Sequence, residues 1–215
     1  MILIGQYDSS YTRRVAIPLT FYGIAFTHEP WSTFGDVEKL RKVNPLIRVP
    51  ALVLESGEVL IETLCILDYV DSLVPQDQRL FPVAQPERYR AMKIAALAAG
   101  FMEKAGAFYF ERIYHNPVAD AWATRCREQV TSTLGELDKD CARRTTPYWF
   151  GDRIGHADIA VATSYRHASE AVPDLVPASR YPALAAFAAR LEDLPAFRAN
   201  AQPFVSSAEI ALKQG

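Results

Sequence analysis

The sequence predicts a small α/β domain followed by an all-helical domain, and three observations lead to this. Short apolar runs alternate with helix-like segments over roughly the first eighty residues. Prolines then gather at Pro75, Pro82 and Pro86, and strand signals almost vanish after them. A chain of 215 residues, half of them hydrophobic, is long enough for two such domains. An α/β half followed by a helical half is typical of two separate cores.

The first half carries signals for four strands and three helices. The Ile-rich run 1–6 predicts a buried strand, and the residues 8–10 are of types that cap helices. Pro18 should bend the helix that follows, because proline lacks a backbone N–H. Strands are expected at 1–6, 26–31, 50–54 and 58–61, and helices at 11–23, 36–43 and from 63 onward. This βαβαββα order predicts a mixed sheet with helices on it, not a doubly wound parallel sheet.

The domain boundaries follow from the same signals. We expect an N-terminal domain at 1–80, a linker at 81–86 and a helical C-terminal domain at 87–215. Alanine-rich sequence, punctuated by prolines, predicts the helices of the second half. These helices are expected at 86–115, 118–142, 156–171, 182–192 and, in a shorter form, 195–200.

Charge and composition exclude several classes of protein. The formal net charge is −2 and no run is rich in Lys or Arg, which argues against a nucleic-acid binder and an electrostatic membrane patch. No apolar stretch reaches about 18 residues and no signal-peptide pattern is present, so we expect a cytosolic protein without a membrane segment. The 3 cysteines and 4 histidines form no CxxC or metal-binding pair, so neither a disulfide framework nor a metal site is expected. Cys65 is expected to be a buried small hydrophobe.

A first cluster of candidate residues lies at the first strand-to-helix turn, 7–13. Ser9 and Ser10 can cap the helix, which stabilises it by about 1 kcal/mol. A hydroxyl here can instead hydrogen-bond a bound thiolate, because a helix N-terminus favours an anion. Taken alone, residue preferences favour capping, and both interpretations stay open at this point.

Two further clusters lie at 44–50 and 60–67. Pro50 cannot donate a ladder hydrogen bond, so it indicates the start of an edge strand; a cis Val49–Pro50 bond would instead be a built feature. Glu62 and Thr63 can hold the ammonium and the carboxylate of one α-amino-acid head group. The plainer interpretation makes Thr63 an N-cap and Glu62 a solvated charge.

Together the three clusters resemble the glutathione S-transferase family. The segments 44–52 and 60–63, which read NPLIRVPAL and LIET, resemble the family signature NPxGKVPxL…LxES. The resemblance covers nearly the whole chain, including the linker and the helical half. It implies a thioredoxin-like N-terminal domain, a C-terminal helical bundle, a homodimer and a role in detoxification.

The resemblance also implies a role for each residue of the last two clusters. Val49, next to cis-Pro50, would hold the cysteinyl part of glutathione through its backbone. Glu62 and Thr63 would hold the γ-glutamyl end, and Arg48 would lie near the glycyl end.

The thiol-activating group has three candidates. Ser9 lies where serine-type members of the family carry the activating hydroxyl. Ser10 stands where a proline often follows that serine, so it is the second candidate. Tyr7 ends the first strand near the place of the phenol in tyrosine-type members, and it is the third. No cysteine lies in this turn, so the chain does not resemble the members that form mixed disulfides with glutathione.

The helical half offers one structural motif and an electrophile pocket. The segment 151–160 resembles the internal capping motif of the family, in which Asp158 bonds back to the backbone at Gly155. The resemblance places the pocket between the domains, where Tyr7, Tyr109 and Arg112 are candidates. Aromatic side chains at such spacing are more often part of a core, and Arg112 is more often part of a surface salt bridge.

We therefore expect a serine-type transferase that activates the thiol of glutathione for attack on a small hydrophobic electrophile. Glutathione is the co-substrate, and no tightly bound cofactor is expected. The same site suits a glutathione-dependent peroxidase, isomerase, dehalogenase or etherase, because these enzymes differ in the electrophile pocket. A non-catalytic binding module of this fold is a further alternative. The intact Ser9, Glu62 and Thr63 argue against that alternative.

Overall fold

The structure is a computed structural model, which describes residues 1–206. The chain forms two compact units. The first unit holds Met1–Leu80 together with the segment that begins at Pro195, and the second holds Phe81–Leu194.

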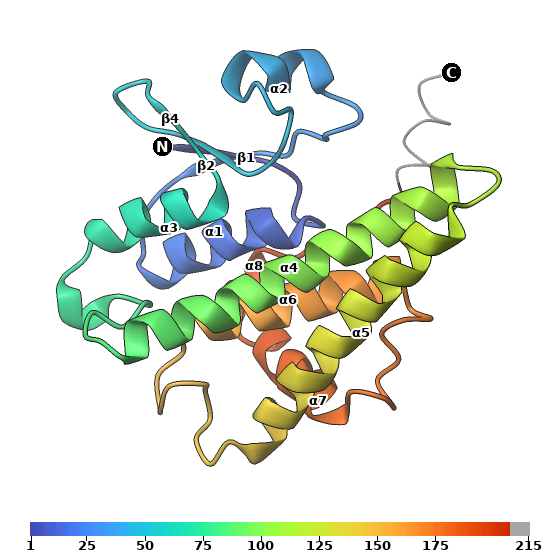
Figure 1. The fold of residues 1–215 in the computed structure, drawn as a ribbon. Helices are drawn as coiled ribbons and strands as arrows, with labels where there is room; N and C mark the ends of the chain where they lie inside the picture. The colour runs from blue at the N-terminus through green and yellow to red at the C-terminus, as the bar shows by residue number, and fades with distance from the viewer. Residues whose placement is uncertain (207–215) are drawn as a thin grey trace. The chain divides into compact units, whose positions relative to one another are not determined.

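A four-stranded mixed sheet forms the centre of the first unit (Figure 1). Its strands are β1 (Ile2–Ile4), β2 (Thr27–Glu29), β3 (Ala51–Val53) and β4 (Val59–Ile61). They lie in the order β2-β1-β3-β4, in which β1 and β2 are parallel and the other two pairs are antiparallel. The mixed sheet and the βαβαββα order expected from the sequence are confirmed, with strands that are shorter than expected.

Helices lie on both faces of this sheet. The helix α2 (Val37–Val43) covers one face, and α1 (Ser10–Phe21) and α3 (Thr63–Ser72) cover the other (Figure 1). Leu3 and Ile4 of β1 are therefore both buried although they point to opposite faces. A short 3-10 helix, Gln76–Gln78, follows α3.

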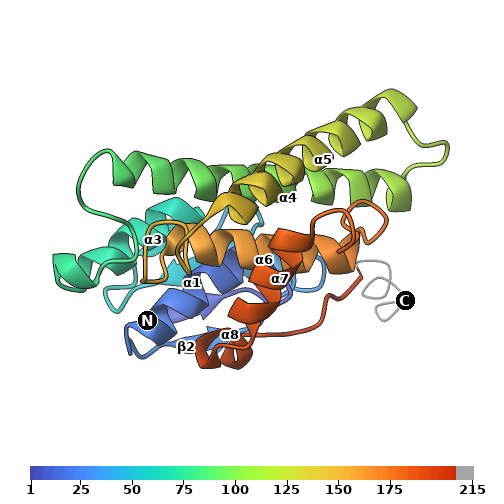
Figure 2. The ribbon, with the colours of Figure 1, turned by 90° about the horizontal axis from the view of Figure 1, so that it is seen from below.

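The second unit is built from four helices, seen together in Figure 2. They are α4 (Glu87–Tyr114), α5 (Asp120–Arg143), α6 (His156–Ala171) and α7 (Pro182–Glu192). The helix α6 packs against α4 and α7, and its side chains are buried over most of its length. Phe101 and Phe108 of α4 are buried core residues. No helix within residues 1–206 is long and apolar enough to cross a membrane.

The chain returns to the first unit at α8 (Pro195–Ala199), which the expected domain boundaries did not include. The reason is a set of contacts with α1. The Nε of Arg13 donates to the carbonyl of Asn200 at 2.7 Å, and its Nη2 donates to the carbonyl of Phe197 at 3.3 Å. The amide of Asn200 in turn donates to the hydroxyl of Thr20 at 2.9 Å. These groups lie about 180 positions apart in the chain, so no local pattern predicts the pairing.

The expectation of a buried Cys65 is wrong, because its side chain is exposed. The buried face of α3 is formed by Thr63, Ile66, Leu67 and Val70. Cys65 lies on the other side of the helix, since residues three or four apart share a face.

Arg13→Met is expected to lower the free energy of unfolding by about 2 kcal/mol, because hydrogen bonds from a charged donor stabilise more than neutral ones. The change keeps most of the side-chain volume and removes the donors to α8. Chemical denaturation followed by circular dichroism measures the effect. Lys42→Met, at an exposed position, is the control. Equal stability of the two variants would show that α8 is not held through Arg13.

Candidate functional site

The three sequence clusters meet at one edge of the sheet, which is formed by the ends of β1, β3 and β4 and not by an outer strand. Ile4 of β1 pairs with Ala51 of β3, and Ala51 pairs with Ile61 of β4. The residues immediately beyond this row are Gly5, Pro50 and Glu62. Since β1 and β4 end here and β3 begins here, the first turn, the loop at 44–50 and the start of α3 are neighbours.

The close approach of α1 and the loop at 44–50 to the end of β1 requires a glycine at position 5. Gly5 has a φ of +132°, which side chains rarely adopt. A Cβ added there would collide with the hydroxyl of Thr12 and come within 2.8 Å of the Cβ of Val49. The absent side chain thus lets α1 and the loop at 44–50 lie against the end of β1.

Ser9 is the N-cap of α1. Its backbone is extended, with φ −69° and ψ 117°, and its Oγ accepts a hydrogen bond from the N–H of Thr12 at 3.4 Å. The capping interpretation of Ser9 is therefore confirmed. It does not exclude the other role, because a hydroxyl that accepts one bond can still donate its own proton. The backbone N–H groups of the first helical turn lie beside it and favour an anion.

The other two candidates for the activating group differ from Ser9 in exposure and contacts. Ser10 is 1% exposed, whereas Ser9 is half-buried. The ring of Tyr7 stacks on that of His28, with centroids 3.8 Å apart, and burial raises the pKa of its phenol. A raised pKa keeps the phenol protonated at neutral pH.

His28 was not predicted to belong to this site. Its Nε2 lies 2.7 Å from the carbonyl oxygen of Gly5, and its ring stacks on the ring of Tyr7. His28 is on β2, which pairs with β1 in parallel, so Leu3 is its partner in the sheet. No motif marks this histidine, and only the strand pairing brings it to the turn.

The loop at 44–50 is tied together by a buried asparagine. The amide of Asn44 donates to the carbonyl of Arg48 at 2.8 Å, and its oxygen accepts from the N–H of Leu46 at 3.0 Å. These bonds hold Ile47 at a φ of +52°, which is costly for a β-branched residue. The Val49–Pro50 peptide bond is cis, Pro50 is buried and Arg48 is exposed.

The start of α3 differs from the plainer interpretation of its sequence. Glu62 is the N-cap, and Thr63 is the first helical residue instead of the cap. Glu62 has a φ of +66°, makes no side-chain capping bond and is exposed, whereas Thr63 is 6% exposed. A non-glycine residue in this region costs about 1–3 kcal/mol, and such residues cluster at functional sites.

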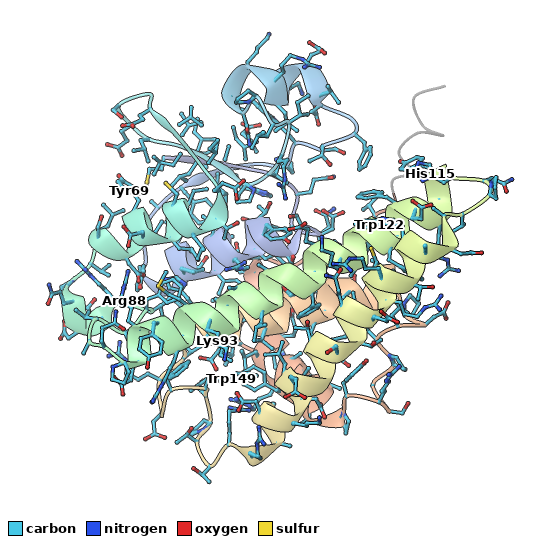
Figure 3. All side chains as sticks on the ribbon, in the orientation of Figure 1. Tyr69, Arg88, Lys93, His115, Trp122 and Trp149 are labelled. Atoms are coloured by element: carbon cyan, nitrogen blue, oxygen red, sulfur yellow. The ribbon has the colours of Figure 1, made fainter. Side chains whose placement is uncertain are left out.

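Asp158 is a structural residue at the start of α6, as the sequence indicates. Its two carboxylate oxygens accept from the N–H of Trp149 at 2.9 Å and the N–H of Gly155 at 2.8 Å. Figure 3 labels Trp149, whose indole nitrogen also donates to Asp140 at 2.8 Å. Gly155 has no side chain to return the bond, so half of a capping box is present. Burial raises the pKa of Asp158 to about 6, against the lowering effect of the two N–H donors.

Of the residues expected at the electrophile pocket, Tyr109 and Arg112 lie near the C-terminal end of α4, which His115 marks in Figure 3, whereas Tyr7 lies in the turn before α1. Tyr109 packs edge-on against Phe110, with ring centroids 5.4 Å apart. Arg112 is half exposed, lies over the ring of Phe108 and forms an ion pair with Asp174 at 3.6 Å. The surface salt bridge that its position indicates is thus present.

Both halves of the chain match family models. The family model "Glutathione S-transferase, N-terminal domain" matches residues 3–78, and the model "Glutathione S-transferase, C-terminal domain" matches residues 120–190. The chain is 26% identical to maleylacetoacetate isomerase of Rattus norvegicus, over 93% of this chain and 91% of the relative. It is 33% identical to the uncharacterized GST-like protein YibF of Escherichia coli over 48% of this chain, and the match spans 50% of that relative.

Among solved structures, a glutathione S-transferase from Methylobacterium radiotolerans in complex with glutathione sulfonate is similar over 96% of both chains. Its TM-score is 0.88 at 27% sequence identity. The likeness extends over the sheet, the helices around it and the helical unit, because nearly all of each chain is aligned.

Proposed function

The chain belongs to the glutathione S-transferase family, and we propose that it binds glutathione at this sheet edge and activates its thiol for attack on a small electrophile. The observation that carries the proposal is the row Ile4, Ala51 and Ile61, which gathers the three clusters at one edge. Glutathione bound to the similar Methylobacterium radiotolerans protein, as its sulfonate, supports this ligand.

Each part of the tripeptide has a proposed partner. The backbone of Val49 holds the cysteinyl part. Glu62 and Thr63 hold the γ-glutamyl end at the start of α3, where an exposed carboxylate and helix N–H groups suit an ammonium and a carboxylate. Arg48 is exposed and can reach the glycyl carboxylate.

Ser9 is the proposed activating group. A cysteine thiol in water has a pKa of about 8.5, and a helix N-terminus with a hydroxyl donor stabilises the thiolate form. The thiol releases its proton to solvent, and the Oγ of Ser9, which accepts from the N–H of Thr12, donates a hydrogen bond to the resulting thiolate. The thiolate then attacks the electrophilic atom, and the electron pair of the broken bond leaves with the departing group. Ser10, which stands where the family often has a proline, is the second candidate, and its burial makes it less accessible than Ser9; Tyr7 is the third.

The test is a glutathione titration by calorimetry, with ultraviolet absorbance of the thiolate followed against pH in the same samples. We expect binding and a thiol pKa well below that of free glutathione. Absence of binding at millimolar glutathione would overturn the transferase proposal and leave a scaffold with another use.

A glutathione-dependent isomerase is the second candidate function, because an isomerase relative is aligned over 91% of its length. An isomerase adds the thiolate to a substrate double bond and releases glutathione again, whereas a transferase consumes the thiol. Incubation with maleylacetoacetate, followed by thiol titration, separates the two: product formed with no thiol loss supports isomerisation. A homodimer, which the family resemblance implies, belongs to the proposal, as does the cytosolic location that the sequence patterns predict.

A further inference from the structure

Gly5 is the joint between β1 and the turn that carries Ser9. Its φ of +132° and the nearby atoms of Thr12 and Val49 exclude a side chain at this position, as described above. Glycine restricts its own backbone less than any other residue. The direction in which the chain leaves β1 therefore has to be fixed by the contacts of Gly5 and its neighbours.

Both backbone groups of Gly5 are bound by β2. Its N–H donates to the carbonyl of Glu29 at 2.9 Å, which continues the strand pairing by one residue beyond Ile4. Its carbonyl oxygen lies 2.7 Å from the Nε2 of His28. Since a carbonyl oxygen can only accept, Nε2 carries the hydrogen and donates it. Because a peptide group is planar, this bond also orients the plane that Gly5 shares with Gln6.

The same imidazole contacts the turn at a second point. The ring of Tyr7 lies 3.8 Å from it, centroid to centroid, and the two ring planes differ by 3°. The N–H of Ser9 donates to the carbonyl of Gln6 at 3.2 Å. His28 thus contacts the residues on both sides of Gln6, and Ser9 is hydrogen-bonded to Gln6 itself. The position of Ser9 therefore depends on a side chain from another strand.

The place of His28 in the sheet explains why its ring reaches the turn. β2 is an outer strand, and His28 is paired with Leu3 of β1. Paired residues point to the same face of a sheet, and successive residues point to opposite faces. Ile4, the next residue of β1, belongs to the cluster with Leu40 of α2. His28 therefore points to the other face, which α1 covers and where the turn leads into α1.

We propose that His28 is a positioning residue for thiol activation: its Nε2–H holds the carbonyl of Gly5 and its ring holds that of Tyr7, so that the hydroxyl of Ser9 faces the bound thiolate. The inference rests on the proposed function, and it adds a residue outside the three sequence clusters. His28 acts through the backbone of the turn and not as an acid or base. Misplacement of a reacting group by about 1 Å can cost about 100-fold in rate, so contacts of this kind control turnover.

The test compares two variants that each remove one of the two contacts. His28→Phe keeps a ring on Tyr7 but loses the donor, whereas His28→Gln keeps an amide N–H near the place of Nε2 but loses the ring. For His28→Phe we expect kcat to fall about tenfold or more and the pKa of the bound glutathione thiol to rise. KM for glutathione should change by less than about threefold, because the tripeptide is held elsewhere. His28→Gln should keep kcat within about threefold of the wild type, although glutamine cannot act as a base.

Thermal stability separates this role from a merely structural one. A ring pair and a hydrogen bond stabilise a protein by similar amounts, so both variants should melt about 2–4 °C below the wild type. Their kcat values should nevertheless differ. Binding of S-methylglutathione, which has no ionisable thiol, should be the same in both variants and the wild type. Thr27→Val, at an exposed position of the same strand, is the control and should match the wild type.

Other outcomes overturn the proposal. Wild-type kcat and thiol pKa in His28→Phe would remove His28 from thiol activation while the proposed function stands. An equal loss of kcat in His28→Gln would show that activity needs the imidazole itself and not the donor to Gly5. If His28→Phe and His28→Asn, whose amide is shorter, both fail to fold, the histidine is structural and the inference is wrong. Failure of the wild type to bind glutathione removes the inference together with the proposed function.

Discussion

Ser9→Ala is expected to reduce kcat by about 100-fold, as removal of one donor from an anion site does in other enzymes. The pKa of the bound glutathione thiol should rise, while glutathione still binds through the residues at 48–50 and 62–63. The reason is the position of this half-buried hydroxyl beside the helix N-terminus, where it can donate a hydrogen bond to a thiolate. Steady-state kinetics and thiolate absorbance against pH measure the two effects.

Capping complicates this variant, because alanine at an N-cap costs about 1 kcal/mol of stability. Ser9→Gly separates the two roles, since glycine caps almost as well as serine and has no hydroxyl. We expect Ser9→Gly to lose activity like Ser9→Ala while it keeps most of the stability. Ser10→Ala and Tyr7→Phe are the matched controls, and both should remain active. A silent Ser9→Ala together with an inactive Tyr7→Phe would move the activating role to the phenol.

Asp158→Ala is expected to lower the free energy of unfolding by about 3 kcal/mol, since the part-buried N–H groups of Trp149 and Gly155 lose their acceptor. In a chain of this length that corresponds to a fall in melting temperature of about 6–12 °C. The control is Asp152→Ala, in the same loop but exposed, which should change stability little. Equal melting temperatures for the two variants would contradict the structural role of Asp158.

The wild type and Asp158→Ala also test how stability depends on pH. Burial raises the pKa of Asp158 in the folded state to about 6, above the value of 3.8 taken for the unfolded chain. The folded state therefore binds this proton more tightly, and the stability that follows is present below about pH 4 and is lost as pH rises toward 6. The stability difference between wild type and Asp158→Ala should thus be larger at pH 4 than at pH 8, as measured by urea denaturation. A difference that grows with pH would show that the N–H donors outweigh burial.

Much of the local structure could be predicted, because its determinants are local. The helices at 156–171 and 182–192 have the bounds that the sequence predicts. Asp158 marks the start of the first, and Pro182 stands at the first position of the second. The hairpin of β3 and β4 follows from a turn signal between two apolar runs.

The mistaken expectations concern which face or which neighbour a residue has. Cys65 is exposed because the rotation of α3 is set by its contacts with α1 and β4, not by hydrophobicity alone. Thr63 is not the cap, because the end of β4 holds Glu62 at a positive φ in that place. His28 joins the first turn only through the pairing of β2 with β1.

Local sequence patterns were enough to predict the class of the two halves, most helices and the three clusters that resemble the family, since periodicity, caps and turns act over a few residues. The surroundings of each group became known only from the folded chain. Strand pairing joins Gly5, Pro50 and Glu62 at one edge, and packing gives Arg13 its carbonyl partners while it leaves Arg14 without any among the described residues. Burial and hydrogen-bond satisfaction depend on segments far apart in the chain, and no local pattern records how those segments meet.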